Sequence, residues 1–420
     1  MNAIVFSHLN LGRGLPGFAK TPLHKAAAGV LALTLATCAG VNSAWSQPAQ
    51  PSAARQTAGQ AAASDPVYWF QRWHHAATQY PYMGTVTVTQ AHEQPRSARV
   101  WHGVRKGQPH MDRIDMLSDD APRTVLRRGR DMAVQWHEKG RHRHAMHEAP
   151  PVGMPFLLSE QMEQAQLRQI AQYYRVVPLG RQRVANYQAE AIGFLPADNL
   201  RMPYRFWTEQ QTGLLLKWQM LDMQRADKPA WDKARVLQEI AFADVQIPAP
   251  VDYAMLQNLM QEIAASQEGR RPPKSPSTPA APGSHRLPTT SLQEQGWVWR
   301  KPLPGYTVKQ CYWRRLGGGP RKEPRKEGPP PAPAEQPVAN KNAAQPRLLQ
   351  CLVTDGLSHF SVFIGPQLPP PPAHAPKRMQ EEGAGVRMAS RMYANSHKIT
   401  AVGAVPQAAL QHAVEALYRP

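Results

Sequence analysis

Large apolar residues first recur at regular spacing between residues 64 and 80. Ser64-Asp65-Pro66 supplies a capping side chain and a first-turn proline, a combination that begins many helices. An apolar face follows at intervals of three or four residues, at Trp69, Phe70, Trp73, Ala77 and Tyr80. The pattern predicts an amphipathic helix, and such a stripe is more often core than ligand site.

From Gly84 onward the period changes to two. Residues 85–89 alternate threonine and valine, which is typical of a strand with one face in water. Further strand candidates lie at residues 98–104, 123–126, 132–136, 187–194, 204–208, 214–223 and 236–245. Short connections favour an antiparallel meander over a parallel sheet. Residues 155–174 break the pattern and are predicted to form one or two short helices against the sheet.

A change of composition at residues 267–290, which are rich in Pro, Ser and Arg, predicts a linker. Beyond it, Trp297-Val298-Trp299 opens a smaller unit with strand candidates at residues 306–313, 348–354, 357–364 and 399–403. Asp355-Gly356 is a hairpin signal because both residues tolerate positive φ. Pro406 starts a final helix with an apolar stripe at Leu410, Ala413, Val414 and Leu417.

Together these elements predict an α+β chain with two domains. The first covers residues 64–266 and the smaller second domain covers residues 291–420, with the linker between them. Low-complexity insertions near residues 316–347 and 366–385 cannot bury enough apolar area to fold, so we expect them to be disordered.

The amino terminus has the features of an export signal. Basic residues, and no acidic one, precede an apolar run over residues 26–37. The run is too short for a stable transmembrane helix, which needs about 20 apolar residues. Residues 1–46 are therefore predicted to be a signal peptide, followed by a flexible leader at residues 47–63, in a periplasmic protein. Lipidation of Cys38 is the alternative, although Thr37 fits poorly before a lipidated cysteine.

The charge balance limits the class of partner. The chain of 420 residues carries a formal net charge of +19, and loss of the three basic residues of the signal peptide leaves +16. An exported protein meets little nucleic acid, so nucleic acid is not expected as a partner. Anionic lipid headgroups, lipopolysaccharide phosphates or an acidic protein fit better. A basic surface kept for solubility is the alternative.

Two cysteines remain after processing, Cys311 and Cys351. In an oxidising compartment an isolated pair is interpreted as a disulfide before a reactive site. The bond would join the strands that flank the larger insertion. Closing a loop of that size stabilises a small domain by about 4 kcal/mol in the chain-entropy model.

No motif for catalysis or for a cofactor is present: there is no phosphate-binding loop, no nucleophile elbow and no zinc helix of the His-Glu-x-x-His type. A histidine cluster could gather around a metal, and it comprises His137, His142, His144 and His147. Its spacing matches no zinc motif, and a solvated, pH-responsive hairpin is the simpler reading. Nearby, Arg127, Arg128 and Arg130 are candidates for an anion contact or for a solvated turn.

Short segments of both domains carry a resemblance to a known protein family. In the first domain the resemblance lies in Tyr82-Met83-Gly84-Thr85-Val86, Arg123-Thr124-Val125-Leu126-Arg127-Arg128-Gly129, Gly180-Arg181-Gln182-Arg183-Val184-Ala185, Tyr204-Arg205-Phe206-Trp207-Thr208, Thr212-Gly213-Leu214-Leu215-Leu216 and Met220-Leu221-Asp222. In the second domain it lies in Gly296-Trp297, Pro302-Leu303-Pro304-Gly305-Tyr306, Tyr312, residues 358–363 and Ile399-Thr400-Ala401-Val402-Gly403. On these segments the chain resembles the MucB/RseB family of periplasmic regulators of the envelope-stress sigma factor. The likeness runs from about residue 65 onward and leaves out the leader, linker and insertions.

This resemblance implies a first domain like the lipoprotein carrier LolA, with a curved, incompletely closed antiparallel sheet covered by helices. It also implies a non-catalytic protein that binds the periplasmic part of an anti-sigma factor of the RseA/MucA type and blocks site-one proteolysis. Release would answer a lipid or lipopolysaccharide signal. A periplasmic lipid or lipoprotein carrier is the alternative function, a metal-dependent hydrolase built on the histidines is another, and a homodimer is one open oligomeric state.

The signal is expected to bind the concave face of the first sheet and to favour a released state. The candidate cavity residues are Trp69, Phe70, Phe156, Leu157, Phe206 and Trp218. For each of them taken singly, a position in a plain core is the favoured alternative.

Overall fold

The computed structural model describes residues 63–91, 93–118, 122–129, 131–138, 141–148, 164–222, 231–268, 289–315, 347–366, 385–394 and 396–420. The predicted signal peptide, Cys38 and nearly all of the leader lie outside these residues, as do most of the two predicted insertions. Within the described ranges, no helix combines the length and the apolar character that a membrane crossing requires.

The first helix forms where the sequence predicts it. α3 (Pro66–Gln79) begins at Asp65, whose carboxylate accepts a hydrogen bond from the Val67 backbone N–H at 2.9 Å, with Pro66 in the first turn. Trp69, Phe70 and Trp73 of its predicted face are buried, whereas Tyr80 is partly exposed and follows the last residue of the helix. The apolar stripe therefore faces a core, and the predicted helix is confirmed.

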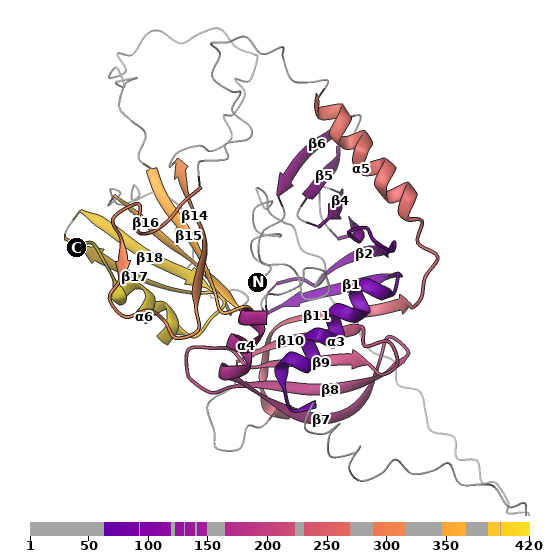
Figure 1. Ribbon diagram of the computed structural model, residues 1–420, viewed down its shortest axis with the longest axis horizontal. Coiled ribbons are helices and arrows are strands. Elements are labelled where there is room, and N and C mark those ends of the chain that lie inside the picture. Colours follow the sequence, from indigo (N-terminus) through magenta and orange to yellow (C-terminus); the bar gives the residue numbers. More distant parts are fainter. Residues whose placement is uncertain are drawn as a thin grey trace, which may run out of the picture. The chain divides into compact units, whose positions relative to one another are not determined.

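An antiparallel sheet of eleven strands dominates the amino-terminal part. Its strands are β1 (Tyr82–Gln90), β2 (Arg96–Gly103), β3 (Met111–Met116), β4 (Arg123–Arg128), β5 (Asp131–Glu138), β6 (Arg141–Glu148), β7 (Tyr174–Val184), β8 (Tyr187–Pro196), β9 (Tyr204–Glu209), β10 (Leu215–Asp222) and β11 (Arg235–Gln246). The order is β6-β5-β4-β3-β2-β1-β11-β10-β9-β8-β7, with β6 and β7 at opposite ends (Figure 1). The predicted meander in an incompletely closed sheet is confirmed.

Helices cover both faces of this sheet. α5 (Tyr253–Glu268) packs over β3 to β5, where Leu256 lies against Gly103. The adjacent residue, His102, reaches the Ala77 carbonyl of α3 instead. Because successive strand residues point to opposite faces, α3 and α5 lie on opposite faces of the sheet. The remaining helices here are α4 (Gln164–Tyr173) and a 3₁₀ turn at Trp231–Lys233.

Several elements were not predicted. β3 has the sequence Met-Asp-Arg-Ile-Asp-Met, and its charged residues obscure the alternation of apolar and polar positions that predicts a strand. β7 contains Pro178 and a register shift before Gly180, features tolerated because β7 is an edge strand. The run that carries three of the clustered histidines, interpreted above as part of a solvated hairpin, forms strand β6. α5 was missed as well, and it extends to Glu268, inside the range predicted as linker.

The carboxy-terminal part has a second antiparallel sheet, of six strands. These are β12 (Thr289–Thr290), β14 (Thr307–Arg315), β15 (Arg347–Thr354), β16 (His359–Pro366), β18 (His397–Gly403) and β17 (Arg387–Tyr393), in that spatial order. β13 (Val298–Trp299) pairs separately with β19 (Leu417–Tyr418). α6 (Gln407–Ala416) buries Leu410, Ala413 and Val414 in the same core as Phe360 and Val362. The smaller α+β unit is confirmed, and β17 is an addition to it.

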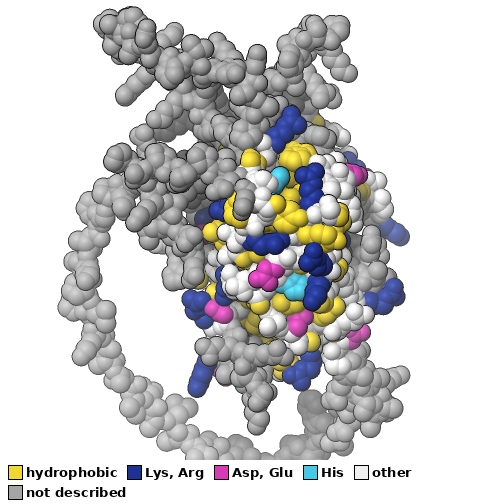
Figure 2. Space-filling view, turned by 90° about the vertical axis from the view of Figure 1, so that its left-hand side faces the viewer, with side chains coloured by type: hydrophobic (Ala, Val, Ile, Leu, Met, Phe, Trp, Pro, Cys, Tyr) yellow, Lys and Arg dark blue, Asp and Glu magenta, His cyan; other side chains and the backbone are white. Residues whose placement is uncertain are grey.

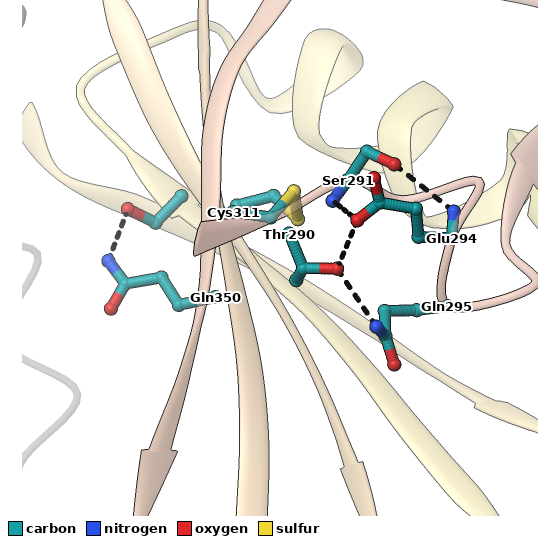
Figure 3. The surroundings of a disulfide bond; sticks show 8 residues. Thr290, Ser291, Glu294, Gln295, Cys311 and Gln350 are labelled. Carbon is teal, nitrogen blue, oxygen red and sulfur yellow. Dashed lines mark hydrogen bonds between the residues drawn. A yellow bond between two sulfur atoms is a disulfide. The ribbon is translucent and has the colours of Figure 1, made fainter. Parts of the chain in front are cut away.

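The predicted disulfide is confirmed. Cys311 on β14 and Cys351 on β15 are directly opposite each other, bonded, and fully buried in the core under α6. Next to the bond, Thr290 of β12 pairs with Cys311, and its hydroxyl donates to Glu294 (Figure 3). Glu294 also accepts from the Ser291 backbone N–H, and the Ser291 hydroxyl accepts from the Glu294 backbone N–H. The disulfide therefore lies where the entering chain is fixed to the sheet.

Candidate binding site

An aromatic layer lies between α3 and strands β8 to β10. The Trp73 ring of α3 packs against Phe206 with centroids 4.7 Å apart and against Phe194 at 6.0 Å. Phe70 meets Phe194 at 5.9 Å. All of these rings are buried. The layer joins α3 to the sheet through apolar rings, and it makes this face of the protein a candidate for apolar ligands.

Four of the six predicted cavity residues belong to this layer. Trp69 and Phe70 lie on α3, Phe206 on β9 and Trp218 on β10. Tyr204 joins Trp218 to the rest, with ring centroids 6.1 Å apart. None of the four is more than 5% exposed. Phe156 and Leu157 lie outside the described residues. The structure brings the four together, and their role as a ligand site stays a prediction.

One polar contact fixes the position of α3 over the layer. The buried Trp73 ring N–H donates to the Thr208 hydroxyl at 2.7 Å.

Thr208→Val keeps the shape of the side chain but leaves the Trp73 ring N–H without an acceptor, so we expect the free energy of unfolding to fall by about 1–3 kcal/mol in urea titrations. The control is Thr87→Val, because the Thr87 hydroxyl donates at 3.2 Å in a partly exposed site and should matter by less than about 0.5 kcal/mol. Equal effects would contradict this role of Thr208.

A second feature is a buried charged contact between the β8–β9 connection and the β15–β16 turn. The Arg201 side chain is fully buried, and its Nε lies 3.3 Å from Asp355 Oδ2. Its guanidinium also donates to Asp198 and to the Pro304 carbonyl. The planar group lies over the Tyr173 ring, 3.8 Å from its centroid. Arg201 therefore links the two sheets.

Both carboxylate oxygens of Asp355 accept hydrogen bonds. Its Oδ1 accepts from the backbone N–H groups of Leu357 at 3.0 Å and Ser358 at 2.7 Å, and Oδ2 accepts from the Tyr174 hydroxyl at 3.4 Å. Burial raises the pKa of Asp355, although these hydrogen bonds and Arg201 oppose the shift. Burial also raises the pKa of Tyr174, so the phenol stays a donor. The sequence predicted the Asp355-Gly356 turn, and Gly356 has a φ of +99°, but nothing predicted this contact.

The arginine candidates are placed differently from one another. Arg127 is buried on β4, its Nε donates to the Gly129 carbonyl at 3.0 Å, and its cross-strand neighbour is Asp112. Arg128 is partly exposed and reaches Gln108 at 3.5 Å. Arg130 lies outside the described residues. Arg127 thus faces an internal carboxylate, and an external anion contact at this turn stays a prediction.

The clustered histidines lie on the β5–β6 hairpin. His137 on β5 is opposite His142 on β6, while His144 and His147 are opposite Gln135 and Met132. His137 Nε2 is 3.0 Å from the Thr124 hydroxyl, and the β6 side chains are outside the described residues. Among the side chains that the structure describes, no three His, Cys, Asp or Glu residues are grouped so that they could hold a metal.

Sequence reasoning missed a buried polar row across the first four strands. Tyr82, His102, Asp112 and Arg127 are successive cross-strand partners, and all four are buried. His102 Nδ1 is 2.6 Å from Asp112 Oδ1. No sequence motif predicts this arrangement, because only the register of strands β1 to β4 brings the four residues into one row. Recognising β3 as a strand would have been the only signal.

Positive charge predominates on the carboxy-terminal part. Its described Lys and Arg side chains are Arg300, Lys301, Lys309, Arg314, Arg347, Arg387, Arg391, Lys398 and Arg419. The acidic ones are Glu294, Asp355 and Glu415, and Asp355 is buried. Figure 2 shows Lys and Arg spread among apolar patches, with fewer Asp and Glu. Such a surface favours an acidic partner.

Comparisons with known proteins give a consistent result. The model of the MucB/RseB N-terminal domain matches residues 65–260, and that of the MucB/RseB C-terminal domain matches residues 291–418. The solved Pseudomonas aeruginosa MucA/MucB complex is similar with a TM-score of 0.52 and 18% identity, over 84% of this chain and 98% of that one. A crystal structure of MucB in complex with MucA(peri) gives 0.53 and 18%, over 84% and 99%.

A more distant match is a LolA superfamily protein from Nitrosomonas europaea, with a TM-score of 0.22 and 9% identity, over 46% of this chain and 97% of that one. No curated protein matches the sequence. At 18% identity, the likeness to the two MucB structures is one of fold.

Proposed function

The chain belongs to the MucB/RseB family, and on this premise we propose that it is a periplasmic, non-catalytic regulator. It binds the periplasmic part of a membrane-anchored anti-sigma factor and shields that segment from site-one proteolysis. The observation that carries the proposal is that both family domains match in order, over both sheets. The two MucB structures similar in fold are, by their titles, complexes with MucA.

The surface chemistry supports a protein partner with acidic residues. The exposed cations of the carboxy-terminal part, such as Lys301 and Lys398, have few acidic neighbours among the described residues. Complementary charge speeds association and selects the partner, and it is screened by salt. Protection then needs no chemistry, because a segment that is covered cannot enter a protease active site.

Release requires a signal that binds the free form more tightly than the complex, because a ligand shifts an equilibrium only through such a difference. We assign this signal to an amphipathic lipid or lipopolysaccharide. The aromatic layer under α3, with Trp73 and Phe206, supplies the apolar surface that an acyl chain needs.

The test combines binding with protection. The purified protein is titrated with the periplasmic segment of the anti-sigma factor from the same genome, and the mixture is then exposed to the site-one protease. We expect a complex whose affinity falls tenfold or more as salt rises from about 0.05 to 0.5 M, and slower cleavage in its presence. A basic protein of unrelated fold at the same concentration controls for charge alone.

Two outcomes would overturn the proposal. One is failure to bind the segment at any salt concentration, which together with tight lipid binding would favour the lipid or lipoprotein carrier. The other is binding without any protection from the protease.

A further inference from the structure

The buried row of Tyr82, His102, Asp112 and Arg127 joins α3 to the sheet through one imidazole. His102 Nε2 lies 2.6 Å from the carbonyl oxygen of Ala77, in the last turn of α3. That carbonyl is among the final four of the helix, which find no partner within the helix. His102 supplies the missing donor, so it fastens the carboxy-terminal end of α3 to β2.

Both ring nitrogens of His102 have a buried partner. A carbonyl oxygen only accepts, so Nε2 carries a proton, and Nδ1 faces Asp112 Oδ1 at 2.6 Å. Burial alone would raise the pKa of Asp112, but the charge and hydrogen bond of His102, together with the charges of His110 and Arg127, outweigh burial and lower it. The Tyr82 ring stacks on the His102 ring with centroids 4.5 Å apart.

A second histidine, His110, lies beside this pair. The His110 ring stacks on His102 with centroids 5.3 Å apart, and its Nε2 lies 3.7 Å from Asp112 Oδ2. Neither of these two atoms has a hydrogen-bond partner among the described residues, and both side chains are more than nine-tenths buried. The groups that face His110 are Asp112 on β3, His102 on β2, Arg127 on β4 and His74 on α3. Asp112 is the single carboxylate among them.

We propose that His102, Asp112 and His110 form a proton-operated latch, in which the Nε2–H of His102 holds the end of α3 down and uptake of a proton by His110 releases it. The site lies one turn beyond Trp73, which anchors α3 on the aromatic layer. Release of this end therefore uncovers the layer to an apolar ligand. The latch makes the opening of α3 dependent on pH, which goes beyond the proposed binding of an anti-sigma factor.

The direction of the pH dependence follows from His110. Burial, together with the positive charges of His102 and Arg127, lowers the pKa of His110 from 6.5 to about 4. The open state, with a more ordinary histidine, binds the extra proton between those two values. The closed state is thus fully favoured above about pH 6.5, and lowering the pH toward 4 reduces the closed-to-open ratio by about two orders of magnitude.

The experiment measures fluorescence of an apolar dye with the purified protein between about pH 7.5 and pH 4. We expect dye binding to rise steeply as the pH falls below 6.5. His110→Gln removes the titrating group and should abolish that rise, whereas His75→Gln, an exposed position on the same helix, should leave it unchanged. His102→Leu removes the donor to Ala77, so its dye binding should be high already at neutral pH.

A side-chain NMR titration of the wild-type histidines keeps the test independent of whether a variant folds. Protonation of His110 and the rise in dye binding should share one midpoint. The latch is overturned if His110→Gln shows the same rise as the wild type, or if His110 takes up its proton with no change in dye binding.

Discussion

Arg201→Met is expected to lower the free energy of unfolding by about 3–5 kcal/mol, because it leaves Asp355 charged and buried without its cation. The remaining partners of Asp355, two backbone N–H groups and the hydroxyls of Ser358 and Tyr174, carry no charge. Guanidinium titration at neutral pH gives the difference. The loss of unfolding free energy in Arg201→Met should become smaller as the pH falls toward 4, because the raised pKa of Asp355 lets its carboxyl take up a proton in the folded state.

A matched variant separates burial from mere loss of an ion pair. Arg235→Met breaks the Arg235–Asp222 pair, whose atoms are 2.7 Å apart but whose side chains are 60% and 37% exposed. Screening by water limits that loss to about 0.2–1 kcal/mol. Arg201→Met combined with Asp355→Asn removes both charges and should recover part of the stability. If Arg201→Met costs no more than Arg235→Met, the buried contact does not link the two sheets energetically.

The sequence predicts best those helices and strands that have one face buried in the core and the other exposed to water. α3 and β1 each show their period clearly, because one side meets the core and the other meets water. β3 and β7 fail this test for opposite reasons. β3 carries Asp112 on a buried position, where charge is not expected, and β7 is an edge strand that is mostly exposed. A pattern rule cannot detect a strand whose buried residue is charged.

The candidate sites also differ in how far the sequence predicts their contacts. The Cys311–Cys351 bond was predictable, since only two cysteines lie beyond the predicted signal peptide and they leave one pairing. The aromatic residues were predicted as a group because they are large and apolar. The contacts of Arg201 and His102 were not predictable, because each depends on the register of strands or on a turn that meets a distant loop. Their partners cannot be deduced without the fold.

Loss of the disulfide is the other change expected to have a large effect on the free energy of unfolding. Cys311→Ala with Cys351→Ala should lower the free energy of unfolding of the carboxy-terminal sheet by about 4 kcal/mol, because the bond closes a loop with a sequence separation of 40. Breaking the bond in the wild type with a thiol retains both side chains and should give most of the same loss. The measurement is guanidinium unfolding of the oxidised, reduced and substituted proteins.

Two readouts locate this effect. The aromatic layer lies in the other sheet, so the near-ultraviolet signal of Trp73 and its neighbours should persist at denaturant concentrations that already unfold the reduced carboxy-terminal core. Chain entropy predicts a loss that grows with the length of the closed loop, so deleting part of residues 316–346, which lie between the two cysteines, should reduce the difference between oxidised and reduced protein. A difference below about 1 kcal/mol in the full-length protein would show that strand pairing alone holds β14 and β15 together.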